Sequence, residues 1–194
     1  MLNERIEARW VTAFTRVFEL CRVAPGEVCA IVSETQSRRV NVHLAELALL
    51  RLGARPFHLQ LVSPVPDAPV AIRSTGASVA LQSLGPAVQA LAGSGFVVDC
   101  TVEGLMHAPE LPAILKGGSR VLYVSNEHPE ALARLVPDDA LEPLVKDHVK
   151  RLRAAREMRV SSPAGTDLRI SLQGAVCGGA TCTFTAWAGA GARA

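Results

Sequence analysis

The chain has few aromatic residues, almost no lysine and little net charge. Aromatic residues make up 4% of its 194 residues, only Lys116, Lys146 and Lys150 are lysine, and the formal net charge is +2 at pH 7. No basic run has aromatic residues between its charges, so the sequence offers neither the phosphate attraction nor the base-stacking platforms typical of nucleic-acid-binding proteins. We therefore expect no nucleic-acid partner.

Paired cysteines and long apolar runs are also missing. The five cysteines show no CxxC spacing, and we interpret Cys21, Cys29 and Cys100 as small apolar core residues in a reducing compartment. The first ten residues, "MLNERIEARW", carry charges where a signal peptide needs an apolar stretch. No apolar run reaches the ~18 residues of a membrane-spanning helix. These absences predict a cytoplasmic protein without a membrane partner.

Three common site motifs do not occur after any predicted strand. The loop after the first strand, "ETQSRRVN", contains no glycine, and neither GxGxxG nor GxxxxGK[ST] follows a later strand. A dinucleotide or P-loop site is therefore not expected. The "GSG" at residues 93–95 precedes a strand, whereas the serine of a hydrolase elbow follows one. The sequence thus gives no support for these site classes.

What is present is an alternation of helices with short apolar strands, in a chain that is 49% hydrophobic. Strands of continuous apolar residues joined by helices are typical of a parallel sheet buried on both faces. "MRVSSPAGTDLRISLQ" then predicts two strands joined by a turn. The fold class is therefore a layered, Rossmann-like α/β domain with a mostly parallel sheet, followed by the start of a hairpin and an irregular tail. The expected helices and strands are a helix over 3–23, a strand over 28–33, a helix over 37–52, a strand over 54–62, a helix from 85, a strand over 96–100, a helix over 109–115, a strand over 119–125, and one helix from Pro129 past Pro137.

We expect three parts along the chain. Residues 1–160 form the α/β domain, residues 161–173 begin a second domain with a hairpin, and residues 174–194 form an Ala/Gly-rich tail. The tail has no hydrophobic period, and its only charged residue is Arg193. Two interpretations of the tail stay open: an aberrant, frameshifted end read from GC-rich DNA, or a genuine disordered tail.

Most of the histidines are expected to be structural or solvated. His43 and Glu46 are three residues apart on a predicted helix, and His58 lies in a strand, where packing at the core edge explains them. His128 stands at a helix start and His148 on a charged helix face. No HExxH motif or complete set of ligands appears, so we expect no metal site in this chain.

His107 is the stronger candidate, because it follows the third strand in the loop "TVEGLMHAPEL". Ligands of open α/β sheets bind at the carboxyl ends of the strands. Asp99 and Glu103 are the other polar groups of this region, and the helix expected from Pro109 offers free N–H donors. His107 is therefore interpreted either as a group that orients a ligand and relays a proton, or as a helix-capping surface residue.

The same region carries a family resemblance. "FVVDCTVEGLMHAPELPAILKGGSRVLYVSNEHPEALARLVP", continued by "MRVSSPAGTDLRISLQ", resembles the N-terminal region of the 2,5-dihydroxypyridine 5,6-dioxygenases over about residues 10–175. That family is related in fold to aminopeptidase T-type metallopeptidases. The resemblance implies Fe(II)-dependent, extradiol-type opening of a dihydroxypyridine ring by O₂ in nicotinate or nicotine catabolism. The implied substrate is thus a small aromatic N-heterocycle, and the implied substrate-binding residues are Met106 and His107.

The resemblance also implies that the iron ligands of complete members, two histidines and an aspartate, lie in a second domain that has no counterpart in this chain. We therefore expect the chain alone to bind no iron, to have no complete catalytic set and to be inactive. Its surface toward the second domain predicts self-association into a homo-oligomer. Two alternatives remain: a fragment of an aminopeptidase T-like metallopeptidase, and a non-catalytic α/β binding module.

Overall fold

The computed structural model of the chain describes residues 5–65, 76–124, 126–136, 138 and 140–175. Its internal contacts divide the chain into two compact units, with the division between Val136 and Pro137. The last helix therefore groups with the hairpin rather than with the sheet. The expected domain boundary at residue 160 stays a prediction.

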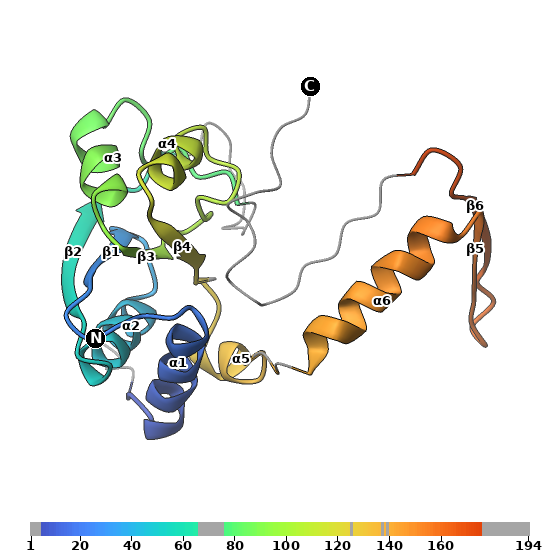
Figure 1. Ribbon diagram of the computed structural model, residues 1–194, viewed down its shortest axis with the longest axis horizontal. Helices are drawn as coiled ribbons and strands as arrows, with labels where there is room; N and C mark the ends of the chain where they lie inside the picture. Colours follow the sequence, from blue (N-terminus) through green and yellow to red (C-terminus); the bar gives the residue numbers. More distant parts are fainter. Residues whose placement is uncertain (1–4, 66–75, 125, 137, 139, 176–194) are drawn as a thin grey trace. The chain divides into compact units, whose positions relative to one another are not determined.

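The first unit is a parallel sheet with helices on both faces (Figure 1). Its strand order is β2-β1-β3-β4, and every neighbouring pair is parallel. This arrangement confirms the α/β fold class with a parallel sheet. The elements are α1 (Ala8–Leu20), β1 (Val28–Glu34), α2 (Arg39–Arg51), β2 (Arg55–Leu61), α3 (Gly85–Ala92), β3 (Phe96–Cys100), α4 (Leu111–Lys116), β4 (Arg120–Tyr123) and α5 (Pro129–Ala133).

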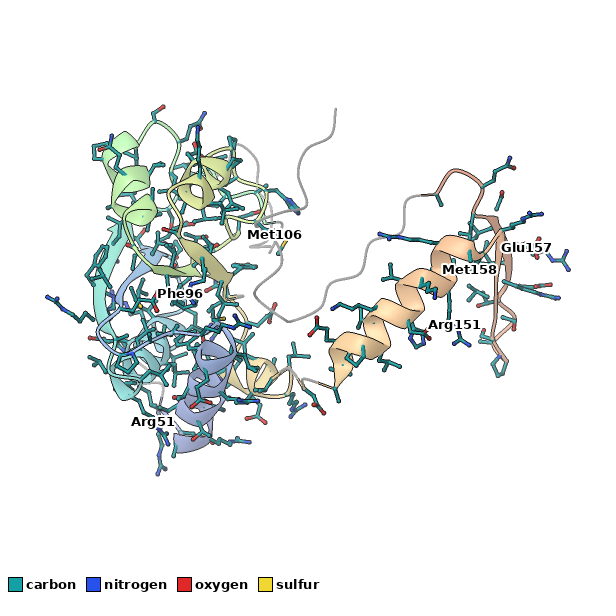
Figure 2. The ribbon with its side chains drawn as sticks, viewed as in Figure 1. Arg51, Phe96, Met106, Arg151, Glu157 and Met158 are labelled. Atoms are coloured by element: carbon teal, nitrogen blue, oxygen red, sulfur yellow. The ribbon has the colours of Figure 1, made fainter. Side chains whose placement is uncertain are left out.

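Two apolar layers hold the helices against the sheet. On the side of α1, the ring of Phe18 contacts the rings of Phe14 and Phe96 edge-on, with centroid distances of 6.2 and 5.6 Å. Figure 2 labels Phe96 within the first unit, where its side chain is only 1% exposed. On the other face, Leu91 of α3 and Ile114 of α4 belong to a buried cluster with residues of β1 and β3. Because both faces are covered, the central strands β1 and β3 are mostly apolar and buried, and their polar residues lie toward their carboxyl ends.

Several helices of this unit start or stop at residues other than those expected, α1 and α4 among them. The first helix, expected over 3–23, ends at Leu20, because Arg22 takes a left-handed φ of 59° and the N–H of Val23 bonds back to the carbonyl of Phe18 at 3.1 Å. The helix expected from Pro109 begins two residues later, at Leu111, with another proline in its first turn. Proline fits that first turn, where its missing N–H would have no partner in the helix.

The single helix expected from Pro129 past Pro137 is wrong. The structure has two helices instead: α5 ends at Ala133, and α6 runs over Leu141–Ala154. Proline lacks the N–H that a helix interior needs, and its ring clashes with the carbonyl four residues earlier. The sequence analysis therefore expected helix in both segments but wrongly joined them into one continuous helix.

The second unit contains α6 and an antiparallel hairpin of β5 (Glu157–Ser161) and β6 (Asp167–Ser171). The hairpin confirms the two strands predicted from the sequence around the Ser-Pro-Ala-Gly turn. No residue of α6 is buried. On one side of the hairpin, Met158 pairs with Ile170 in the strand register.

The described part of the chain contains no helix that is long and apolar enough to cross a membrane. Cys21, Cys29 and Cys100 are buried and free, as expected of core residues. The other two cysteines, Cys177 and Cys182, lie outside the described residues, as does most of the tail expected over 174–194.

Candidate functional site

The carboxylate of Asp99 organises the loop that leaves β3. Asp99 is fully buried, and its Oδ1 accepts the backbone N–H of Thr101 at 3.0 Å and the Thr101 hydroxyl at 2.6 Å. Its Oδ2 accepts the backbone N–H of Leu105 at 2.6 Å. The Thr101 hydroxyl oxygen in turn accepts the N–H of Gly104 at 3.1 Å. The first half of the loop is therefore wrapped around one carboxylate, both of whose oxygens are used.

A second buried carboxylate, Glu34, lies at the end of the neighbouring strand β1 and is 4% exposed. Its Oε1 accepts the hydroxyl of Ser78 at 3.2 Å and the backbone N–H of Val102 at 3.1 Å. The N–H of Glu34 donates to Ser37 Oγ, and the Ser37 hydroxyl donates to the carbonyl of Cys100, each at 2.7 Å. Side chains thus tie the carboxyl ends of β1 and β3 to each other and to the loop.

A short segment, residues 76–78, lies against this loop through backbone hydrogen bonds. The N–H of Gly76 donates to the carbonyl of Glu103 and the N–H of His107 donates to the carbonyl of Gly76, both at 2.5 Å. The N–H of Ser78 donates to the carbonyl of Gly104 at 2.8 Å. Since the Ser78 hydroxyl also bonds to Glu34, the segment is fixed at both of its ends.

Two glycines permit the close approaches in this region. A Cβ on Gly76, whose φ is +75°, would lie 3.1 Å from Cδ2 of His107 and 3.1 Å from Cβ of Met106. A Cβ on Gly104, whose φ is +84°, would lie 2.7 Å from the ring of Tyr123. Only glycine fits both the left-handed backbone and the available space at these positions.

The structure places Met106 and His107 together at the exposed side of the loop. Met106, which Figure 2 labels, is 53% exposed, and His107 is exposed as well. Glu103 is half-buried in the same loop, whereas Asp99 points inward and serves the backbone. The helix that follows starts only at Leu111. That Met106 and His107 bind substrate stays a prediction.

Burial sets the electrostatics beneath the loop. Burial is the main reason why the pKa of the Asp99 carboxyl rises from 3.8 to about 6, and the neighbouring Glu34 carboxylate makes a smaller contribution in the same direction. The hydrogen bonds from Thr101 and Leu105 act in the opposite direction, because they stabilise the ionised form. At neutral pH the loop therefore rests on a desolvated negative charge that backbone donors surround.

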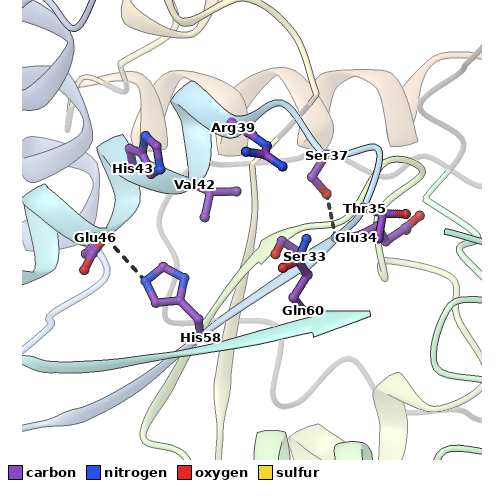
Figure 3. Close-up of a pocket in the computed structure, with 10 residues that line it drawn as sticks. All are labelled: Ser33, Glu34, Thr35, Ser37, Arg39, Val42, His43, Glu46, His58 and Gln60. Atoms are coloured by element: carbon purple, nitrogen blue, oxygen red, sulfur yellow. Dashed lines mark hydrogen bonds and ion pairs between the residues drawn. The ribbon is translucent and has the colours of Figure 1, made fainter. Parts of the chain in front are cut away.

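A polar pocket of about 330 Å³ lies between α2 and the strands β1 and β2 (Figure 3). His58 on β2 contacts Glu46 on α2, with 3.4 Å between Nε2 and Oε2. The residues lining the pocket are Ser33, Glu34, Thr35, Ser37, Arg39, Val42, His43, Glu46, His58 and Gln60. Met106 and His107 are not among them.

Sequence reasoning treated His43, Glu46 and His58 as separate packing residues and missed this pocket. The pocket is assembled from a loop, a helix and an edge strand. The available signal was the position of all three segments near the carboxyl ends of β1 and β2, where α/β sheets form crevices.

His128 has a structural role. Its Nδ1 accepts the N–H of Glu130 at 3.2 Å and caps α5, and its ring contacts Trp10 edge-on at 5.3 Å. His148 is exposed on α6, where its Nδ1 lies 2.7 Å from the carbonyl of Leu144. Both residues are exposed, as expected, but His128 also anchors the start of a helix.

Among the described residues, no three His, Cys, Asp or Glu side chains lie close enough together to hold a metal ion. The described part of the chain therefore does not fit the ligand set, two histidines and an aspartate, that the resemblance implies for iron. That this chain binds no iron remains a prediction.

Comparison with known proteins supports one family. The model of the family described as 2,5-dihydroxypyridine 5,6-dioxygenase matches residues 9–192. The 2,5-dihydroxypyridine 5,6-dioxygenase of Pseudomonas putida strain KT2440 is 32% identical over 171 residues, which are 85% of this chain and 47% of that protein. The solved structure of the 2,5-dihydroxypyridine dioxygenase from Pseudomonas putida KT2440 is 30% identical, with a TM-score of 0.70, over 87% of this chain and 48% of that one.

The chain thus spans about half the length of the curated relative that it matches. The matched region includes the four-stranded sheet, the loop after β3 and the hairpin. On this sequence and structural similarity, the chain belongs to the 2,5-dihydroxypyridine 5,6-dioxygenase family.

Proposed function

We propose that this chain provides the α/β part of a cytoplasmic dioxygenase that opens a dihydroxylated pyridine ring, and that loop 101–108 forms one wall of the substrate pocket. The family match carries the proposal. It is supported by the loop itself, which presents Met106 and His107 at the carboxyl edge of the sheet, where ligands of α/β folds bind.

In this proposal the two exposed side chains of the loop have different roles. The imidazole of His107 orients the ring by a hydrogen bond to a ring hydroxyl and accepts or returns its proton. The thioether side chain of Met106 provides an adaptable apolar wall against the ring. Iron, which the resemblance implies for complete members, would supply the activation of oxygen. The described residues do not fit its ligand set.

A binding experiment on the chain tests this proposal directly. Chain labelled with ¹³C at the methionine methyl groups and histidine rings is titrated with 2,5-dihydroxypyridine without oxygen, and leucinamide serves as the comparison ligand for a peptidase. We expect the signals of Met106 and His107 to shift with dihydroxypyridine but not with leucinamide. In the His107→Ala variant, we expect the shift of Met106 to be lost. Shifts of His43 and His58 instead, a response to leucinamide only, or no response at all would contradict the proposal.

Self-association is a separate prediction of the same account. A homo-oligomer in solution would be seen as a mass above 20.5 kDa by light scattering. A monomer over the whole concentration range would contradict it without affecting the assignment of the loop.

A further inference from the structure

We propose that Asp99 and Glu34 are positioning residues for the Met106–His107 pair, and that Asp99 acts through both of its oxygens whereas Glu34 acts through one. This inference rests on the proposed function in one respect only: substrate binding explains why the Met106–His107 pair needs a fixed position. The two carboxylates come from neighbouring strands, are 0% and 4% exposed, and reach the loop by different routes.

Asp99 acts from the N-terminal side of the pair. Its Oδ2 holds the N–H of Leu105, the residue immediately before Met106, at 2.6 Å. Its Oδ1 holds Thr101 by two hydrogen bonds. A buried carboxylate that accepts three donors in this way fixes the path of the backbone, because each lost bond would leave a buried donor without a partner.

Glu34 acts by a second route, which includes the segment 76–78. Its Oε1 holds the N–H of Val102 and also the hydroxyl of Ser78, which lies in the segment whose Gly76 carbonyl accepts the N–H of His107. His107 is therefore secured through Gly76 and Ser78 as well as through Leu105. Oε2 of Glu34 makes no hydrogen bond among the described residues, and Glu34 lines the polar pocket.

This difference in the use of oxygens makes the proposal testable with two isosteric variants. In Asp99→Asn, an amide nitrogen replaces one oxygen and cannot accept the N–H of Leu105, so one hydrogen bond of the loop is lost. In Glu34→Gln, the remaining amide oxygen can still accept from both Ser78 and Val102. Each variant removes one buried negative charge, so a purely electrostatic or packing role predicts similar effects for both.

The measurement is residue-resolved amide hydrogen exchange by NMR on the 194-residue chain, together with the ring signal of His107. For Asp99→Asn, we expect the exchange of Leu105 to accelerate roughly tenfold or more relative to Val98 of β3, and the His107 signal to move. For Glu34→Gln, we expect the exchange of the Val102 amide to stay within about threefold of its wild-type rate, because the remaining side-chain oxygen still accepts its N–H. The exposed Asp147→Asn variant is the matched control and leaves both signals unchanged.

Equal effects of Asp99→Asn and Glu34→Gln on the loop, or faster exchange in the loop and β3 alike, would overturn the proposal. If Asp99→Asn does not fold, the comparison of Glu34→Ala with Glu34→Gln carries the same test at Val102. The alanine variant should free this amide and the glutamine variant should not, and equal rates would overturn the proposal. Because no substrate is needed, failure of the chain to bind dihydroxypyridine would contradict the proposed function and leave this inference standing.

Discussion

Replacing Asp99 by asparagine should change how the stability of the protein depends on pH. Burial raises the pKa of this carboxyl from 3.8 to about 6 in the folded chain. Between these two values the folded state binds a proton that the unfolded state has released. The free energy of unfolding therefore falls as pH rises from about 4 to about 6, because stability falls with pH wherever the native state binds more protons.

The size of this effect follows from the shift. A shift of about two pH units at 1.36 kcal/mol per unit amounts to about 3 kcal/mol, which is fully present below pH 4 and lost above pH 6. The asparagine of the Asp99→Asn variant cannot ionise, so the variant lacks this pH-dependent contribution to stability. At neutral pH, removal of the desolvated charge offsets much of the cost of the lost bond to Leu105, so the loop can loosen while the fold keeps its overall stability.

The assay is urea unfolding of the wild type and Asp99→Asn at half-unit steps from pH 3.5 to 7.5. The difference in free energy, variant minus wild type, should rise by about 3 kcal/mol between pH 4 and 6 and then level off. Titration of the exposed carboxylates cancels in this difference. A difference that stays flat or falls with pH would refute the reasoning, since it would mean that burial does not dominate the electrostatics of Asp99.

Three further predictions concern other parts of the first unit. Gly76→Ala forces a Cβ into a left-handed backbone 3.1 Å from the ring of His107, so we expect a loss of about 1–2 kcal/mol in urea unfolding and a shifted His107 signal; an unshifted signal would count against the contact. Arg120→Ala leaves Glu27, whose side chain is 17% exposed, without its guanidinium partner, and should lower the free energy of unfolding by about 2 kcal/mol, whereas an unchanged urea midpoint would contradict this. Burial raises the pKa of the Cys29 thiol to about 11, so a thiol reagent at pH 8 should modify Cys29 only as fast as the protein unfolds, and rapid labelling of Cys29 itself in the native chain, located by peptide mass spectrometry, would refute its burial.

Elements formed by local chemistry could be predicted from the sequence. The residues of β3, Phe96–Cys100, were expected with the observed bounds because they form a short continuous run between a Gly-Ser-Gly turn and a polar loop. The second helix closes before Gly53, which adopts a φ of +72° as a C-terminal cap should. The hairpin of the second unit likewise followed from its turn residues.

The hydrophobic pattern could not predict that the Asp99 side chain points inward and accepts backbone hydrogen bonds. β3 is buried on both faces, so the period-two alternation that would place a side chain on one face carries no signal there. The spacing Asp-x-Thr was a usable local signal, because aspartate often accepts hydrogen bonds from the backbone two residues on. The bond to Leu105 and the repulsion from Glu34 depend on the tertiary fold.

Long-range partners account for what else the sequence missed. Glu34 and Ser78 are 44 residues apart, and Glu34 and Val102 are 68 apart, so no local pattern joins them. The pocket between His43 and His58 also forms only once α2 has packed beside β2. Family resemblance indicated the loop of Met106 and His107, whereas the hydrogen bonds of Asp99 and Glu34 beneath that loop were found only in the structure.

A hybrid enzyme tests the central claim most directly. Residues 9–173 of this chain would replace the matching part of the Pseudomonas putida 2,5-dihydroxypyridine 5,6-dioxygenase, and the loss of dihydroxypyridine and the uptake of O₂ would be followed together. The account predicts ring opening by the hybrid and its loss in the hybrid carrying His107→Ala. A hybrid that folds cooperatively but leaves the ring intact, or one that is equally active without His107, would contradict the account.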